Sequence, residues 1–139
     1  SYLEKGQTPW TPSISIVFAL SVALEMMLKE GLANIIKRHA RMAKMTRDGV
    51  KALGLSLFAD ESYASNTVTS VAASDGLDVK ELLKILREEH QVVLAGGQQK
   101  LQGKLFRIGH LGWVVEEDIV RVLKALTVAL PQAGFRSSS

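Results

Sequence analysis

The hydrophobic period changes at Gly54, and this change constrains the fold more than any other feature of the 139 residues. Before Gly54, apolar residues recur every three or four positions along two segments, Ser13 to Gly31 and Leu32 to Gly54, as in amphipathic helices. After Gly54, short runs rich in β-branched residues precede and follow further helical stretches. This order predicts a mixed α+β fold.

Two prolines mark the start of the helical region. Pro9 and Pro12 fix their own φ and keep the preceding residues out of the helical conformation, so Thr8–Pro12 predicts a turn before a helix that begins near Ser13. The apolar run Ile14–Leu24 is shorter than the roughly 20 residues of a bilayer span and predicts a buried helix. No signal-peptide pattern precedes it. We therefore expect no membrane contact and a cytoplasmic location.

Four short runs after Gly54 predict strands: Leu55–Phe58, Thr67–Ala72, Gln91–Ala95 and Lys104–His110. Asp78 and Glu81 have the spacing of a capping box, which predicts a helix that runs to about Glu89. Acidic residues from Glu116 onward favour a last helix, which Pro131 ends. The expected architecture is α+β: a small, mainly antiparallel sheet with helices packed on one face and a long N-terminal helical segment.

Composition excludes several kinds of chemistry. The chain has no cysteine, so it can hold no disulfide scaffold, thiolate metal site, iron–sulfur cluster or cysteine nucleophile. Its histidines, His39, His90 and His110, lie far apart and show no metal-ligand spacing. We expect no metal site.

The net charge of +3 is concentrated in one stretch. Its cations are Lys37, Arg38, Arg41, Lys44, Arg47 and Lys51. Helical spacing places several of them on one side, where they could face phosphate, but no aromatic residue interleaves with them for base stacking. The pattern favours a solvated helix face, and we expect no nucleic-acid partner.

Two segments combine a permissive backbone with specific polar groups. In Thr8–Pro12, hydroxyl groups precede a helix whose N-terminal amides can receive an anion. In the second segment, the glycine-rich stretch 95–103 precedes Arg107, which lies between Phe106 and Ile108 in an apolar strand. The Arg107 guanidinium either reaches an edge, pairs with a buried acid, or grips a ligand carboxylate with two hydrogen bonds.

Five motifs carry a resemblance to a known family: Gly-Gln-Thr-Pro-Trp-Thr-Pro (6–12), Glu-Gly-Leu-Ala-Asn (30–34), Arg-His-Ala-Arg (38–41), Ala-Gly-Gly-Gln (95–98) and Gly-Lys-Leu-Phe-Arg-Ile-Gly-His-Leu-Gly (103–112). In this order they resemble the C-terminal small domain of the class V, fold-type I aminotransferases. The alanine-glyoxylate and serine-glyoxylate aminotransferases are most similar, together with proteins described as the small or tritium-exchange subunit of a soluble hydrogenase. The resemblance extends from about Gly6 to Leu130.

The resemblance implies site residues. Thr8 and Thr11 match the stretch that reaches the phosphate of pyridoxal phosphate in the neighbouring subunit. Arg107 matches the arginine that binds the α-carboxylate of the amino-acid substrate. Gly96 and Gly97 match a segment that lines the substrate cleft, where the absence of side chains lets the backbone approach the ligand.

The resemblance also implies that the reacting groups lie elsewhere. In this family the Schiff-base lysine, the acidic partner of the pyridine nitrogen and the aromatic ring stacked on the cofactor belong to a large domain that precedes the matched part. It therefore assigns no catalytic residue to this chain. We expect that the chain alone is inactive and binds no pyridoxal phosphate, which belongs to the full-length protein.

The expected partners are the large domain of the same polypeptide, a second subunit of a homodimer, and an amino-acid or keto-acid substrate. The expected organisation is a linker and turn over residues 1–12, the small domain over 13–131 and a flexible tail over 132–139. An alternative is an autonomous α+β module that binds a small carboxylate through Arg107, Gly96 and Gly97.

Overall fold

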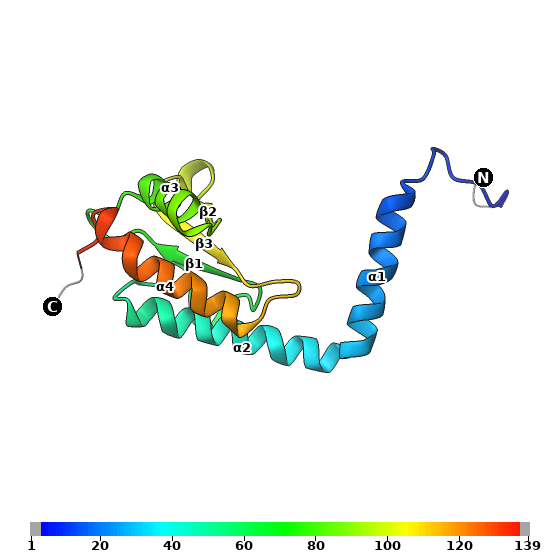
Figure 1. Cartoon of the computed structure of the whole chain (residues 1–139), viewed down its shortest axis with the longest axis horizontal. Helices are drawn as coiled ribbons and strands as arrows, with labels where there is room; N and C mark the ends of the chain where they lie inside the picture. The colour runs from blue at the N-terminus through cyan, green and yellow to red at the C-terminus, as the bar shows by residue number, and fades with distance from the viewer. Residues whose placement is uncertain (1–3, 137–139) are drawn as a thin grey trace. The chain divides into compact units, whose positions relative to one another are not determined.

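The computed structural model describes residues 4–136. Its helices are α1 (Ile14–Glu30), α2 (Leu32–Ala52), α3 (Val79–His90) and α4 (Glu116–Gln132), and its strands are β1 (Val68–Ala72), β2 (Ala95–Gly96) and β3 (Leu105–Gly109) (Figure 1). Single 3-10 turns lie at Glu61–Tyr63 and Gln99–Leu101. The chain divides into two compact units, residues 1–36 and 37–139.

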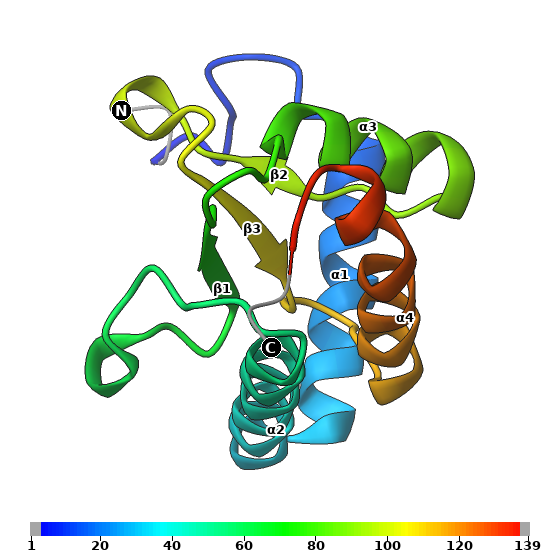
Figure 2. The same cartoon turned by 90° about the vertical axis from the view of Figure 1, so that its left-hand side faces the viewer.

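The second unit contains the sheet. Its strand order is β1-β3-β2, and both pairings are antiparallel. Helices α3 and α4 lie on the same side of this sheet (Figure 2). The expected α+β architecture with a small antiparallel sheet is confirmed.

Successive side chains of β3 point to opposite faces of the sheet, and one of these faces packs in the hydrophobic core. Phe106 and Ile108 are almost completely buried, with 0% and 1% exposure, and pack in the core with Val71 of β1 and Leu126 of α4. Because successive residues of a strand point to opposite faces, Arg107 lies on the other face of the sheet. The apolar run that predicted this strand therefore positions one cation outside the core.

Two of the four strand predictions are wrong. Of Leu55–Phe58, only Leu57 pairs, through an isolated bridge to Val71. Of Gln91–Ala95, only Ala95 belongs to a strand, because Gln91 takes a left-handed conformation with φ of 55° at the end of α3. Val92 is buried and its amide donates to the carbonyl of Leu86, so these residues end the helix rather than extend the sheet.

The two longer helices of the second unit pack closely at a glycine. A Cβ atom added to Gly49 on α2 would lie 2.3 Å from a methyl carbon of Leu123 on α4. Helix α4 ends one residue beyond Pro131, close to the predicted stop. Ala133 and Phe135 then pack against the core, whereas residues 137–139 of the expected tail lie outside the described part of the chain.

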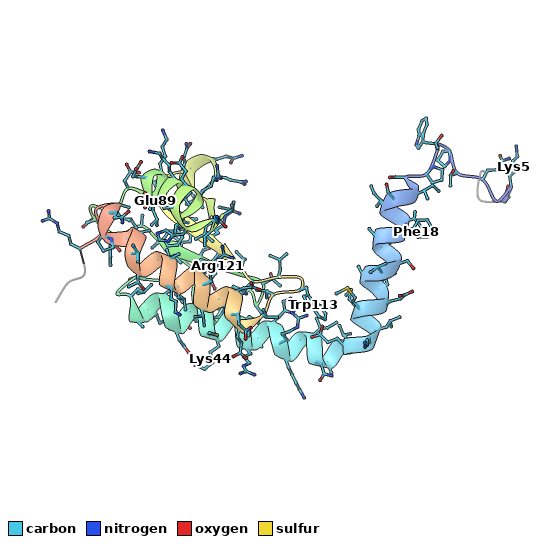
Figure 3. The ribbon with its side chains drawn as sticks, viewed as in Figure 1. Lys5, Phe18, Lys44, Glu89, Trp113 and Arg121 are labelled. Atoms are coloured by element: carbon cyan, nitrogen blue, oxygen red, sulfur yellow. The ribbon has the colours of Figure 1, made fainter. Side chains whose placement is uncertain are left out.

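In the first unit, the prediction of a buried helix is wrong: α1 has no buried residue. Phe18, labelled in Figure 3, is 69% exposed, and Leu28 is 81% exposed. Apolar side chains occupy several sides of this helix, and the described residues bury none of them. Within residues 4–136, no helix is both long and apolar enough to cross a membrane.

Candidate functional site

Arg107 lies at the centre of the sheet face opposite α3 and α4. It is half-buried on β3, between Ser70 of β1 and Ala95 of β2. Its Nε donates to the carbonyl oxygen of Gly96 at 3.2 Å. Among residues 4–136 no carboxylate pairs with it, so the reading as an arginine held by a buried acid is not supported. The terminal nitrogens keep their capacity to bind an oxyanion.

Gly96 and Gly97 lie beside this arginine. Gly96 pairs with Phe106, and the amide of Gly97 donates to the carbonyl of Leu105 at 3.0 Å. The structure thus brings together three of the predicted site residues, whereas Thr8 and Thr11 lie in the first unit. The structure also gives Gly97 a local role, since the carbonyl of Leu101 occupies the space that its side chain would take.

Substitution of Gly97 by alanine should destabilise this loop. The added Cβ would lie 2.0 Å from the backbone oxygen of Leu101, and backbone cannot yield as a side chain can. We expect the free energy of unfolding to fall by about 1–3 kcal/mol, measured by urea denaturation.

Gly96→Ala is the matched control. Its Cβ would meet only a terminal methyl carbon of Leu83 at 3.3 Å, which a small side-chain movement relieves. The expected loss is below about 1 kcal/mol. Equal losses for the two variants would show that the close approach of Leu101 does not govern this turn.

The turn before α1 presents free hydrogen-bond donors. Thr8 and Thr11 are exposed, and the hydroxyl of Thr8 donates to the carbonyl of Trp10 at 2.6 Å. Ser13 makes no side-chain cap, and the first turn of α1 contains no acidic residue. The amide donors ahead of Val17 and the Thr11 hydroxyl are compatible with a phosphate group.

A buried histidine fixes the end of β3. His110 has 0% exposure; its Nε2 lies 2.8 Å from the hydroxyl of Thr69 and its Nδ1 lies 3.1 Å from the carbonyl of Asn66. A neutral ring satisfies both contacts if Nδ1 donates to the carbonyl and Nε2 accepts from the hydroxyl. Burial lowers the pKa of His110 below its ordinary value of 6.5, because desolvation disfavours the charged ring.

This histidine makes stability depend on pH in a defined direction. Below pH 6.5 the unfolded chain takes up a proton at His110 that the folded chain does not, so stability present above pH 6.5 is lost as the pH falls toward the lower folded pKa. Urea midpoints measured from pH 7.5 to 5 should therefore decline. His110→Gln should flatten this decline; an unchanged slope would show that another group causes it.

Arg38 holds the loop that follows β3. Its Nη1 donates to the carbonyls of Gly112 and Val114 at 2.9 and 3.2 Å, and its guanidinium lies 5.5 Å from the ring centroid of Trp113. Figure 3 shows Trp113 in this loop, close to α2. Arg47 of the same helix is also structural, since its side chain is only 13% exposed and its Nη1 donates to the carbonyl of Ser65 at 3.3 Å. The basic stretch that the sequence predicted to be a solvated face therefore includes cations that hold loops, which their spacing did not reveal.

The remaining cations of α2 are largely paired. Arg41 lies 2.5 Å from Glu116, and Lys44 lies 2.6 Å from Asp48 and lowers the pKa of that carboxyl. Lys51 pairs with Glu61. These contacts support the expected solvated face, because they reduce the charge available to a polyanion.

One groove on the second unit lies away from the predicted site. It has a volume of about 770 Å³ between α3 and α4, where Figure 3 labels Glu89 and Arg121. None of Arg107, Gly96 and Gly97 lines it. Among the described residues, no group of three potential metal ligands from His, Asp and Glu gathers anywhere.

Comparisons with known proteins cover nearly the whole chain. It is 46% identical to an uncharacterised aminotransferase of Methanocaldococcus jannaschii over 96% of its length and 43% identical to a soluble hydrogenase small subunit of a Synechococcus strain over 94%. The crystal structure of pyridoxamine-pyruvate aminotransferase from Mesorhizobium loti superposes with a TM-score of 0.87 over 93% of this chain, at 41% identity.

The match covers only part of each relative. The chain spans 35% and 34% of the two curated relatives and 33% of the crystallised protein. No protein-family model matches the chain. The likeness is therefore to about one third of a larger aminotransferase.

Proposed function

Because the chain is homologous to the C-terminal small domain of the alanine/serine-glyoxylate and pyridoxamine-pyruvate aminotransferases, we propose that it is the substrate-carboxylate-binding part of a pyridoxal-phosphate-dependent aminotransferase. The observation that carries this proposal is the unpaired, half-buried Arg107. The substrate class is an amino acid and its keto-acid partner.

Arg107 binds and orients the substrate in this proposal. Its Nε is engaged by the carbonyl of Gly96, which limits rotation of the guanidinium and leaves the terminal nitrogens for two parallel hydrogen bonds to a carboxylate. Two of its neighbours in the sheet, Ala95 and Gly109, carry no side chain larger than a methyl group. Fixing the carboxylate fixes the position of the adjacent α-carbon.

The turn before α1 binds the cofactor phosphate of a neighbouring subunit in this proposal. Thr11 supplies a hydroxyl and the first turn of α1 supplies backbone amides, with no acidic residue to repel the anion. Thr8 holds the turn through its hydrogen bond to Trp10. When bound, pyridoxal phosphate supplies the electron sink for chemistry at the substrate α-carbon.

The exposed helix α1 supports a larger partner. Nine large apolar side chains of α1 are more than 45% exposed: Ile14, Ile16, Val17, Phe18, Leu20, Val22, Leu24, Met27 and Leu28. A helix that is apolar on several sides is buried in larger proteins. We infer that the remaining two thirds of an aminotransferase, and its second subunit, cover this helix.

Pyridoxal phosphate titration tests the proposal that the cofactor-binding and reacting groups lie outside this chain. The isolated chain should give no saturable change in cofactor absorption and no transamination of an amino acid with glyoxylate or pyruvate. The full-length aminotransferase that contains this chain should give both. Saturable cofactor binding with turnover by the isolated chain would refute the proposal that the reacting groups lie outside it.

The second candidate is an autonomous module that binds a small carboxylate at Arg107. The same guanidinium favours this candidate, because Arg107 supplies the positive charge for a carboxylate without help from another part of a protein. Titration of the isolated chain with pyruvate, followed by Trp113 fluorescence, separates the two. Saturable binding that Arg107→Ala abolishes would favour the module, and its absence would favour the aminotransferase part.

A further inference from the structure

The neighbour of Arg107 across the sheet is a serine. Ser70 on β1 pairs directly with Arg107 on β3. The amide of His110 donates to the carbonyl of Thr67, and the amide of Ala73 donates to the carbonyl of Lys104, both at 2.9 Å. Hydrogen-bonded pairs alternate along an antiparallel ladder, so Ser70 and Arg107 form a non-hydrogen-bonded pair. Side chains of such a pair stand closest, with Cβ atoms about 4.5–5.5 Å apart on the same face.

The other neighbours of Arg107 on this face carry no hydrogen-bonding side chain. Ala95 lies opposite it on β2, and Leu105 and Gly109 lie two residues away along β3. Ser70 is therefore the hydroxyl that the described sheet places beside the guanidinium.

The Ser70 hydroxyl is available. Within residues 4–136 this hydroxyl makes no hydrogen bond. It is also not a buried, unsatisfied polar atom, so it reaches solvent although the residue as a whole is half-buried. The Ser70 hydroxyl therefore has no hydrogen bond in the described part of the chain that stabilises the fold. Replacement of Ser70 by alanine should preserve the packing of β1 at this position.

The two side chains belong to adjacent strands and lie on the same face of the sheet. Arg107 leans toward β2, where its Nε donates to Gly96, whereas Ser70 lies on β1 on the other side. A carboxylate can bridge donors that do not touch each other, because its two oxygens accept from different directions. We propose that Ser70 donates a hydrogen bond to the carboxylate that Arg107 binds and so contributes to recognition of the amino-acid substrate.

This inference rests on the proposed role of Arg107, and its test is Ser70→Ala in the full-length aminotransferase. Loss of a hydrogen bond to a charged group should raise KM for the amino acid about 10-fold, with kcat changed less than about twofold. Ser70→Thr keeps the hydroxyl and should remain within about threefold of the wild-type KM. Ser56→Ala, an exposed serine beside the other edge of β1, is the matched control and should leave KM unchanged.

An amine that lacks the carboxylate separates recognition from folding. Ser70→Ala should leave kcat/KM for this amine unchanged, because the lost hydrogen bond is absent from its complex. An unchanged KM for the amino acid in Ser70→Ala, with a large rise in Arg107→Ala, would overturn the role of Ser70 and keep that of Arg107. No rise in either variant would overturn both.

Discussion

Arg107→Ala in the full-length aminotransferase should lower kcat/KM for the amino-acid substrate by about 100-fold or more. In the proposed substrate complex the variant removes two charge-assisted hydrogen bonds, each of which contributes roughly 1.5–3 kcal/mol in a partly desolvated site. Affinity for pyridoxal phosphate should change little, because the proposed phosphate donors lie near Thr11. Steady-state kinetics and a cofactor titration of the same preparation measure the two effects.

Arg107→Lys is the matched control for charge. Lysine keeps one positive charge but cannot form two parallel hydrogen bonds to a carboxylate, so it should restore only part of the loss. A variant pair in which lysine is fully active would contradict the bidentate geometry. An unchanged KM in Arg107→Ala would contradict the carboxylate role itself.

Phe106→Ala should give the largest loss of stability in the chain, about 3–5 kcal/mol. Phe106 is fully buried beside Val71 and is the largest side chain with no exposure, so its removal leaves a cavity beneath β3. A loss of this size is a large part of the roughly 5–15 kcal/mol that holds a domain folded. Urea denaturation of the 139-residue chain measures it.

Phe58→Ala is the control for Phe106→Ala. Phe58 is 49% exposed, and the hydrogen bond that its backbone amide donates to the carbonyl of Ser70 survives the substitution. Its expected loss is about 1 kcal/mol. Similar losses for the two phenylalanines would contradict the position of the core under the central strand.

Sequence patterns correctly predicted the helix with a capped first turn and the strands that bury one face in the core. The capping spacing of Asp78 and Glu81 predicted α3, whose first turn the Asp78 carboxylate caps by accepting from the Glu81 amide at 3.0 Å. The β-branched run predicted β1, and the apolar run around Arg107 predicted β3. The short runs 55–58 and 91–95 were wrongly predicted as strands. Residues 55–58 lie beside the edge of β1 with a single bridge, and Gln91 ends α3 in a left-handed conformation, so a short apolar run alone did not identify a strand.

The sequence singled out only some residues of the candidate site. An arginine between Phe106 and Ile108 was conspicuous, because strand alternation places it opposite the core. Ser70 carried no such signal, since its relation to Arg107 depends on the register of two strands that are far apart in the chain. The burial predicted for α1 was wrong for this chain, because its apolar side chains have no cover within residues 4–136.

The names of the relatives include both aminotransferases and soluble hydrogenase subunits. The absence of cysteine means that this chain offers no thiolate to nickel or to an iron–sulfur cluster. Its half-buried, unpaired Arg107 instead has the donor geometry for a carboxylate. This donor geometry is consistent with the proposed carboxylate-binding role.

Substrate discrimination tests the central claim most directly. The measurement compares kcat/KM for an amino acid with kcat/KM for the amine that lacks its carboxylate, in the full-length wild type and in Arg107→Ala. The wild type should prefer the amino acid, and the variant should lose about 100-fold of that preference while its activity on the amine stays near the wild-type value. An equal preference in the two proteins would contradict the assignment of carboxylate recognition to this chain.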